Sequence, residues 1–105
     1  MQNALRSLGE GGLFLYPQTS KEIVSSMKYV YLLESISHPG KRYIGITTDL
    51  QKRLTYHNSG KSPHTMDFKP WRIVVAIRFA DDQKADVFEK YLKSGSGHAF
   101  AKRHF

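Results

Sequence analysis

The stretch Trp71–Phe79 constrains the fold of this 105-residue chain more than any other. Its side chains are largely β-branched or aromatic, and its middle is apolar on both faces. Such a run is typical of a central strand that is covered on both sides. The sequence therefore predicts a sheet in which this strand lies at the centre.

Two further strands are predicted upstream, at residues 29–33 and 42–46. Alternation along the first strand divides its side chains between two faces, Tyr29, Tyr31 and Leu33 on one and Val30 and Leu32 on the other. Pro39-Gly40 between the strands is typical of a type II turn, so we expect an antiparallel hairpin with a long loop. Gly45, inside the second strand, marks either a bulge or a close backbone approach.

The first predicted helix follows this hairpin directly. Thr48 resembles an N-cap, and Gln51 three residues later completes a capping-box pattern. The helix is expected to run from Asp49 to about Asn58, where Asn58-Ser59-Gly60 gives a C-terminal signal.

A second helix is predicted to open at Asp81-Asp82 and to reach about Ser94, closed by Gly95 and Gly97. We interpret residues 94–97 as a helix C-cap rather than a phosphate-binding turn. A short basic helix at 98–104 follows. The order of elements predicts a small α/β (α+β) domain built on a three-stranded sheet flanked by helices.

The positive charge of the chain is unevenly placed. Sixteen Lys and Arg oppose nine Asp and Glu, for a formal net charge of +7. Residues 1–27 are neutral overall and Gly-rich, which predicts a poorly ordered or partly helical arm, whereas the functional domain is expected at 28–105. A small basic domain most often binds nucleic acid, because neutralising phosphates releases counterions. The alternative is a protein that is basic without a nucleic-acid partner.

Other classes of protein are disfavoured by what the sequence lacks. No apolar run approaches the ~18–20 residues of a membrane span. A basic amphipathic helix for membrane-surface binding is not evident either, nor is an obligate protein partner. The absence of cysteine excludes disulfides, thiolate zinc sites and cysteine nucleophiles, and permits the cytoplasmic location that we expect.

Arg53 and His57 are candidate catalytic residues, because side chains four apart converge on one helix face. A guanidinium beside an imidazole suits phosphodiester chemistry, in which Arg stabilises charge on phosphate oxygens and His relays a proton. The alternative is that Arg53 spans the helix flank and His57 lies half exposed at the helix end.

Glu89 falls within the apolar stripe of the second helix, on the same face as Phe88 and Leu92. A buried carboxylate is costly unless it pairs with a cation or binds a metal. The metal interpretation favours Mg²⁺ or Mn²⁺, which bind through one or two carboxylates, water and substrate phosphate. The alternative is an ion pair with Arg53, Lys52 or an arginine of a strand.

Tyr31 and Tyr43 belong to paired strands and are expected to share a face. Tyrosine usually packs, since a pKa near 10 makes it a poor base, but a nearby Arg and a metal would lower that pKa. The histidines without metal-binding spacing are interpreted as surface residues, namely His38, His64, His98 and His104.

Taken in order, these segments resemble the GIY-YIG nuclease domain, including the N-terminal domain of the excision-repair excinucleases. Its two motifs appear as Tyr29-Val30-Tyr31 and Tyr43-Ile44-Gly45, followed by the helix with Arg53 and His57 and the helix with Glu89. The resemblance covers about residues 28–97 and is to the small stand-alone members.

The resemblance implies a three-stranded antiparallel sheet and a metal-dependent DNA endonuclease, in repair or recombination. It further implies that Tyr31 and Tyr43 lie at the active centre, that Tyr31 is the general base or orients the water, and that Glu89 holds one Mg²⁺ or Mn²⁺. Arg53 would stabilise the transition state and His57 would assist proton transfer. The alternative function is a non-catalytic nucleic-acid-binding module that retains the nuclease fold.

Two positions depart from the family pattern. Tyr29 replaces the first glycine, and no Asn follows Asn58, which leaves Ser94, Ser96 or His98 as candidate substitutes. The basic residues expected to contact DNA phosphates are Lys41, Arg42, Lys52, Lys61, Lys93, Lys102 and Arg103.

Overall fold

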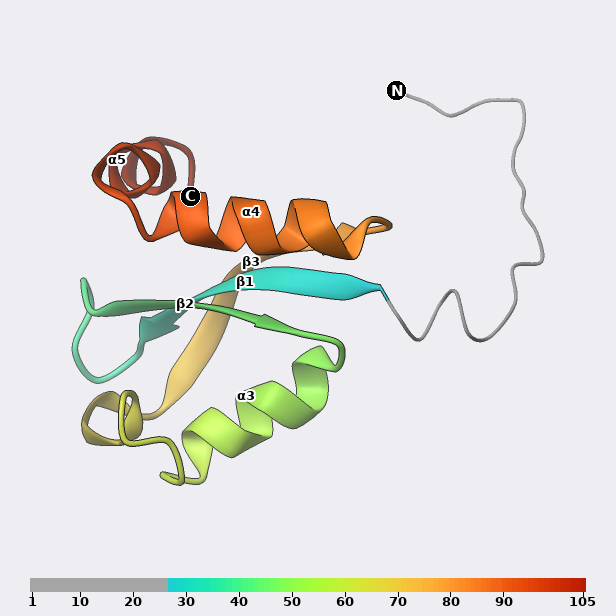
Figure 1. Cartoon of the computed structure of the whole chain (residues 1–105). Helices are drawn as coiled ribbons and strands as arrows, with labels where there is room; N and C mark the ends of the chain where they lie inside the picture. Colours follow the sequence, from blue (N-terminus) through green and yellow to red (C-terminus); the bar gives the residue numbers. More distant parts are fainter. Residues whose placement is uncertain (1–26) are drawn as a thin grey trace, which may run out of the picture.

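The structure is a computed structural model that describes residues 27–105, so the arm predicted at 1–27 lies, apart from Met27, outside the described residues. This part of the chain forms three strands, three α-helices and a 3₁₀ turn (Figure 1): β1 (Lys28–Ser35), β2 (Arg42–Thr47), α3 (Leu50–Asn58), η3 (Met66–Phe68), β3 (Trp71–Phe79), α4 (Asp82–Leu92) and α5 (Gly95–His104). The expected three-stranded α+β domain is confirmed.

The strands form one antiparallel sheet in the order β2-β1-β3. The hairpin of β1 and β2 is as predicted, but β1 is the central strand and Trp71–Phe79 is an edge strand. The prediction that Trp71–Phe79 is central is therefore wrong. The expected cover on both sides is present, because α3 packs against one of its faces and α4 against the other, and this cover makes an edge strand as apolar as a central one.

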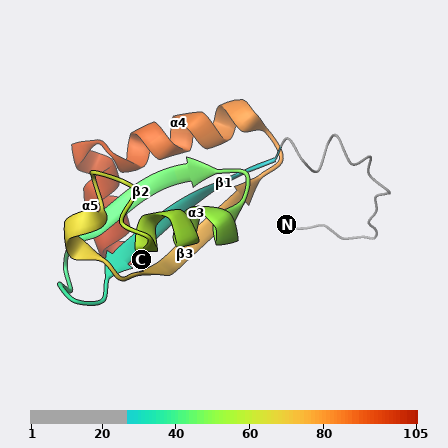
Figure 2. The same cartoon turned by 90° about the horizontal axis from the view of Figure 1, so that it is seen from below.

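Helices cover both faces of the sheet, with α3 on one side and α4 and α5 on the other (Figures 1 and 2). As alternation predicts, β1 contributes to two separate cores. Val30 and Leu32 pack with Ile44 and with residues of α4 and α5, whereas Tyr31 and Leu33 pack with Trp71 and α3. Within residues 27–105, no helix is long and apolar enough to cross a membrane.

The predicted start of α3 is displaced by one residue. Asp49, not Thr48, is the N-cap, and its Oδ1 accepts a hydrogen bond from the Lys52 backbone N–H at 3.0 Å. A carboxylate satisfies a free N–H at a helix start and also suits the helix dipole, so Asp49 takes the cap position ahead of its neighbour.

The end of α4 also differs from the prediction, because the helix stops at Leu92. Ser94 is the N-cap of α5 and accepts from the Gly97 N–H, so residues 94–97 open a new helix instead of capping the previous one. A side chain on Gly97 would collide with the Tyr91 carbonyl, which explains why glycine stands at this helix crossing.

Candidate active site

A chain of buried hydrogen bonds links β1, α3 and the loop that precedes β3. The Tyr31 hydroxyl lies 2.8 Å from Nε2 of His57, and Nδ1 of His57 lies 2.9 Å from the Thr65 hydroxyl. These three side chains are 2%, 1% and 0% exposed, so the bonds are shielded from bulk solvent. The alternative that His57 lies half exposed at the end of its helix is wrong.

Tyr43 completes an aromatic cluster at the open side of this chain. Its ring centroid lies 5.0 Å from that of His57 and 6.5 Å from that of Tyr31. The expectation that both tyrosines share a face of the hairpin is confirmed, since Tyr43 packs against the core that contains Tyr31. Tyr43 is only partly buried, so it connects the buried chain with the surface.

Gly45 makes room for the Tyr31 ring. The two residues are directly opposite each other in the register of β1 and β2, and a Cβ atom on Gly45 would collide with the phenol. Pairing of β1 with β2 continues through this point without a register shift. Of the two explanations that the sequence left open, the close backbone approach is therefore correct.

Arg53 lies on the exposed side of α3, one turn before His57. Its guanidinium carbon is 5.8 Å from the centre of the Tyr56 ring. Together with residues at the start of α3 it borders a hollow of about 560 Å³, lined by Thr47, Thr48, Asp49, Lys52, Arg53 and Tyr56. The guanidinium therefore borders an open space next to the buried hydrogen-bond chain.

The charges around Tyr31 connect it with two other predicted site residues. Burial, assisted by Tyr43, raises the pKa of Tyr31 to about 12; the positive charge of Arg53 opposes this shift and the negative charge of Glu89 adds to it. Burial, and then the charge of Arg53, lowers the pKa of His57. At neutral pH the phenol is therefore protonated and the imidazole is neutral.

Glu89 lies on the opposite helix layer, in α4, with a side chain that is 15% exposed. Its Oε2 is 2.6 Å from Nζ of Lys93, one turn later. Arg53, Lys52 and the strand arginines, which the sequence suggested as its partners, do not form an ion pair with it in the described part of the chain. Glu89 is paired instead with Lys93 of its own helix.

A metal at Glu89 would depend on few protein ligands. Among residues 27–105, no three His, Asp or Glu side chains are grouped as a metal-binding cluster. One carboxylate with water and substrate phosphate is a common way to bind Mg²⁺. The Lys93 ammonium on Glu89 indicates that this carboxylate is placed to receive a cation, so the residues present fit such an ion.

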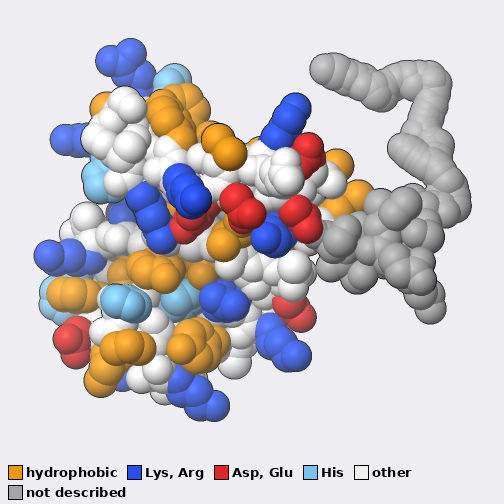
Figure 3. Space-filling view, in the orientation of Figure 1, with side chains coloured by type: hydrophobic (Ala, Val, Ile, Leu, Met, Phe, Trp, Pro, Cys, Tyr) orange, Lys and Arg blue, Asp and Glu red, His pale blue; other side chains and the backbone are white. Residues whose placement is uncertain are grey.

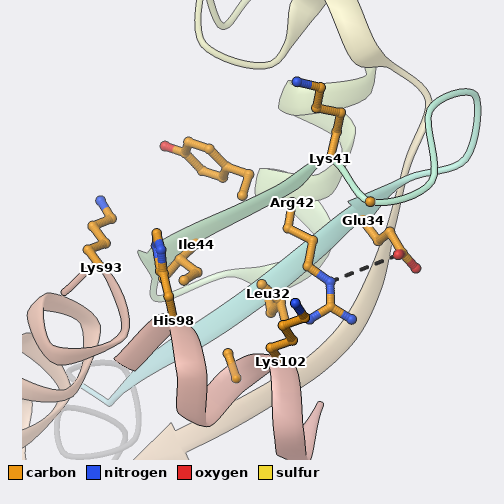
Figure 4. Close-up of a pocket in the computed structure, with 11 residues that line it drawn as sticks. Leu32, Glu34, Lys41, Arg42, Ile44, Lys93, His98 and Lys102 are labelled. Atoms are coloured by element: carbon orange, nitrogen blue, oxygen red, sulfur yellow. Dashed lines mark ion pairs between the residues drawn. The ribbon is translucent and has the colours of Figure 1, made fainter. Parts of the chain in front are cut away.

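A basic groove lies between β2, its hairpin loop and α5 (Figure 4). It has a volume of about 760 Å³, and Leu32, Ile44 and Ala101 form its apolar floor. Its basic or imidazole lining residues are Lys41, Arg42, Lys93, His98 and Lys102, and one carboxylate, Glu34, also lines it and is ion-paired with Arg42 (Figure 4). Tyr43 also lines the groove, but its ring packs on the α3 face, so the groove and the aromatic cluster around His57 lie on opposite faces of the sheet and meet at the edge formed by β2.

The remaining residues predicted to contact DNA are dispersed. Lys52 borders the hollow beside Arg53, whereas Lys61 and Arg103 are exposed outside both the groove and that hollow. Figure 3 shows Lys and Arg side chains spread over the face that carries β2, while Asp and Glu gather mainly along α4. The four histidines that were predicted to lie on the surface are exposed, namely His38, His64, His98 and His104.

The candidate substitutes for the missing Asn have different surroundings. Ser94 donates to the Tyr91 carbonyl and accepts from the Gly97 N–H, so its hydroxyl is used in capping. The Ser96 hydroxyl lies 3.4 Å from that of Ser94, whereas His98 lines the groove. Of the three, His98 is the one that faces the space next to Tyr43.

Thr65 is the site residue that the sequence did not indicate. It lies in the loop between α3 and β3, where no periodic pattern relates it to His57. Its carbonyl accepts from Nε1 of Trp71 at 2.8 Å. The Asn58 side chain holds Trp71 in turn, accepting from its N–H at 2.6 Å and donating to its carbonyl at 3.1 Å.

Comparison with known proteins adds a family to this geometry. Residues 27–102 match the model of the GIY-YIG catalytic domain. A UPF0213 protein of Streptococcus pneumoniae is 41% identical over 66 residues, which are 62% of this chain and 65% of that protein, just under two thirds of its length. One of Cupriavidus pinatubonensis is 34% identical over 79 residues, 71% of this chain and 86% of that protein.

Two further similarities come from a longer protein and from a solved structure. The structure-specific endonuclease subunit SLX1 of Candida dubliniensis is 36% identical over 89 residues, which cover 78% of this chain and 30% of that protein. The solution NMR structure of the UPF0213 protein BH0048 from Bacillus halodurans is 31% identical, with a TM-score of 0.46 over 73% of this chain and 83% of that one.

Proposed function

The chain belongs to the GIY-YIG family, and we propose that it is a metal-dependent endonuclease that hydrolyses phosphodiester bonds of DNA. The observation that carries the proposal is the buried hydrogen bond between Tyr31 and His57, with the charge of Arg53 acting on both. Hydrolysis requires a group that removes a proton from water and a cation that stabilises charge on the phosphate. These side chains supply both.

Tyr31 and His57 would act together on the attacking water. With a pKa of about 12 the phenol does not ionise by itself at neutral pH, so Tyr31 alone is a poor base. As water gives a proton to the Tyr31 oxygen, the phenol proton passes to Nε2 of His57, the new oxygen–phosphorus bond forms, and the bond between phosphorus and the leaving 3′ oxygen breaks. The imidazole can accept this proton because burial and Arg53 keep it neutral beforehand.

Arg53 would bind the phosphate from the hollow that it borders. Its guanidinium can donate two hydrogen bonds to phosphate oxygens and stabilise the charge that develops there. Because its positive charge also opposes protonation of His57, binding the negative phosphate would remove this penalty when the proton moves. Arg53 thereby couples substrate binding to the proton relay.

Glu89 would hold one Mg²⁺ or Mn²⁺ through its carboxylate, with Lys93 displaced. Such an ion supplies Lewis-acid stabilisation of the phosphate and the leaving oxygen. Asp86 is another carboxylate of α4, but it is ion-paired with Lys28, and we expect no role for it in metal binding.

DNA would approach along the groove beside β2. Its basic rim suits phosphates, and from there DNA would pass the β2 edge at Tyr43 to reach the cluster around His57. We include Lys52, Lys61 and Arg103 as more peripheral phosphate contacts. One relative is named a structure-specific endonuclease subunit, which supports a role for branched DNA and hence for repair or recombination.

The proposal is tested by assaying linear, branched and single-stranded DNA with and without Mg²⁺ or Mn²⁺. Glu89→Gln is expected to abolish cleavage because the metal loses its ligand, while folding persists. Asp86→Asn is the matched control, since it removes a carboxylate of the same helix that is ion-paired with Lys28. Equal cleavage by wild type and Glu89→Gln would show that Glu89 holds no catalytic metal.

The second candidate function is nucleic-acid binding without cleavage. It is favoured by the ion pair between Glu89 and Lys93, because the Lys93 ammonium competes with a metal for this carboxylate. Under this alternative, DNA binding is salt-dependent and Lys93→Ala leaves the protein inactive. Under the nuclease proposal, Lys93→Ala still cleaves and requires less metal, although it binds DNA more weakly because one basic residue of the groove is lost.

A further inference from the structure

We infer that Thr65 is a positioning residue, whose hydroxyl accepts the Nδ1–H of His57 and thereby holds the imidazole in the tautomer that leaves Nε2 free to accept the Tyr31 proton. The catalytic consequence rests on the proposed function. The tautomer of His57 does not depend on that function, and it can be measured without any substrate.

The first step of the argument is the position of Thr65. His57 has one polar neighbour on each ring nitrogen, Tyr31 on Nε2 and Thr65 on Nδ1, at 2.8 and 2.9 Å. All three side chains are nearly inaccessible to water. A neutral imidazole has one N–H and one lone pair, so the two hydroxyls must take opposite roles.

The second step decides the direction of the two bonds. A phenol is a much stronger acid than an aliphatic hydroxyl, so it is the better donor and the poorer acceptor. Tyr31 therefore donates to Nε2, and Thr65 accepts from Nδ1–H. In the opposite arrangement, the threonine hydroxyl would donate to Nδ1 and the phenol oxygen would accept from Nε2–H.

The third step is that Thr65 is fixed in place. Its N–H donates to the Ser62 carbonyl at 3.2 Å, and its own carbonyl accepts from the Trp71 indole and from the Phe68 N–H. Asn58 holds the Trp71 backbone and is the neighbour of His57 on α3. The loop and the helix end are thus tied to each other, and the threonine hydroxyl cannot drift from the imidazole.

The fourth step is the effect on the relay. If Nδ1 loses its acceptor, its buried hydrogen has no partner, and the imidazole gains by moving the hydrogen to Nε2, where the Tyr31 oxygen can accept it. An Nε2 that already carries hydrogen cannot take the phenol proton. Loss of the Thr65 hydroxyl would therefore block proton transfer without removing any group that touches the substrate.

Long-range ¹H–¹⁵N NMR of the imidazole tests this inference, because it reports which nitrogen carries the hydrogen. In wild-type protein at neutral pH we expect His57 to be the Nδ1–H tautomer. Thr65→Val, which has nearly the same shape but no hydroxyl, is expected to shift the population toward Nε2–H, and Thr65→Ser to restore Nδ1–H. An Nε2–H tautomer in the wild type, or no shift in Thr65→Val, would overturn the inference.

Cleavage assays then measure the consequence. We expect Thr65→Val to lower kcat by about 10- to 100-fold, as loss of an orienting partner of a histidine commonly does, with KM little changed and with Thr65→Ser close to wild type. An unchanged kcat in a Thr65→Val protein with the shifted tautomer would overturn the positioning role.

Two outcomes separate this inference from the nuclease proposal. If Thr65→Val does not fold, the wild-type NMR spectrum and Thr65→Ser still decide the tautomer. If the wild type has the expected tautomer but cleaves no DNA, the nuclease proposal fails while the hydrogen-bond assignment stands.

Discussion

The two faces of the sheet are built differently, although the same strand supplies both. On the face covered by α4 and α5, the buried residues are all apolar, and Val30, Leu32 and Leu92 are typical of them. On the face covered by α3, Tyr31 packs beside the buried polar residues His57 and Thr65. Burial of polar groups is unfavourable unless each finds a partner, and here each does.

The comparison indicates a division of roles between the faces. The apolar face contributes stability through burial, which depends on volume and not on direction. The polar face depends on the direction of a few hydrogen bonds, which is what proton transfer requires. We therefore expect substitutions of the buried polar residues on the α3 face to alter chemistry, and substitutions of the buried apolar residues on the α4 and α5 face to alter stability. Glu89 and the basic residues of the groove lie outside this division, because they are not part of the apolar core.

The largest expected effect is on activity, from Tyr31→Phe. Loss of the phenol removes the group next to the water and is expected to reduce cleavage by about 10²- to 10⁴-fold. Tyr56→Phe is the matched control, because Tyr56 also packs against His57, at 5.6 Å between ring centroids, but is 40% exposed. Similar losses of kcat in both variants would contradict a specific role for Tyr31.

On the other face, Leu32→Ala is expected to lower the free energy of unfolding by about 2–5 kcal/mol, since Leu32 is 2% exposed in the apolar core. Urea denaturation measures this change. Val87→Ala, at a side chain that is 67% exposed, should stay within about 0.5 kcal/mol of wild type. The Leu32→Ala protein that remains folded should keep the wild-type kcat. A lower kcat of this folded protein would contradict the division of roles between the two faces of the sheet.

The polar face also predicts how stability depends on pH. Folding raises the pKa of Tyr31 from 10.0 to about 12, so stability falls as pH rises through this interval, by on the order of 3 kcal/mol. Folding lowers the pKa of His57 from 6.5, so its contribution is present above pH 6.5 and declines as pH falls below it.

Urea denaturation between pH 5 and 12 can separate these two contributions. Tyr31→Phe should remove the alkaline decline associated with the phenol, while the acid decline persists. An alkaline limb of the same size in wild type and Tyr31→Phe would show that other groups cause it.

The smallest expected effect concerns the groove. Lys102→Ala should weaken DNA binding modestly and reduce the slope of log K against log salt by about one, with stability unchanged. Lys84→Ala, on the exposed side of α4 and away from the groove, serves as the control. Fluorescence anisotropy at several salt concentrations measures the slope, and equal slopes for both variants would remove the groove from the DNA path.

Much of the fold is predictable from local patterns, because alternation, turn residues and helix signals act over few residues. The faces of β1 and the position of His57 on α3 follow from such patterns. The position of β3 in the sheet does not, because coverage by α3 and α4 makes an edge strand as apolar as a central one.

The candidate site is only partly predictable for a related reason. Arg53 and His57 are found through their spacing on one helix, and Tyr31 and Tyr43 through strand pairing. Thr65 lies in a loop, and its bond to His57 depends on how Asn58 and Trp71 fold that loop back onto the helix. Lys93 was not among the partners predicted for Glu89, although residues four apart on a helix are neighbours on its surface.

The close approach at Gly45 has a consequence for how this sequence can change over time. Because the phenol of Tyr31 occupies the space that a side chain at 45 would need, position 45 is not free to vary while Tyr31 stays as it is. Homologues that gain a larger residue at 45 should have lost the tyrosine first and, if the proposed mechanism holds, their nuclease activity with it.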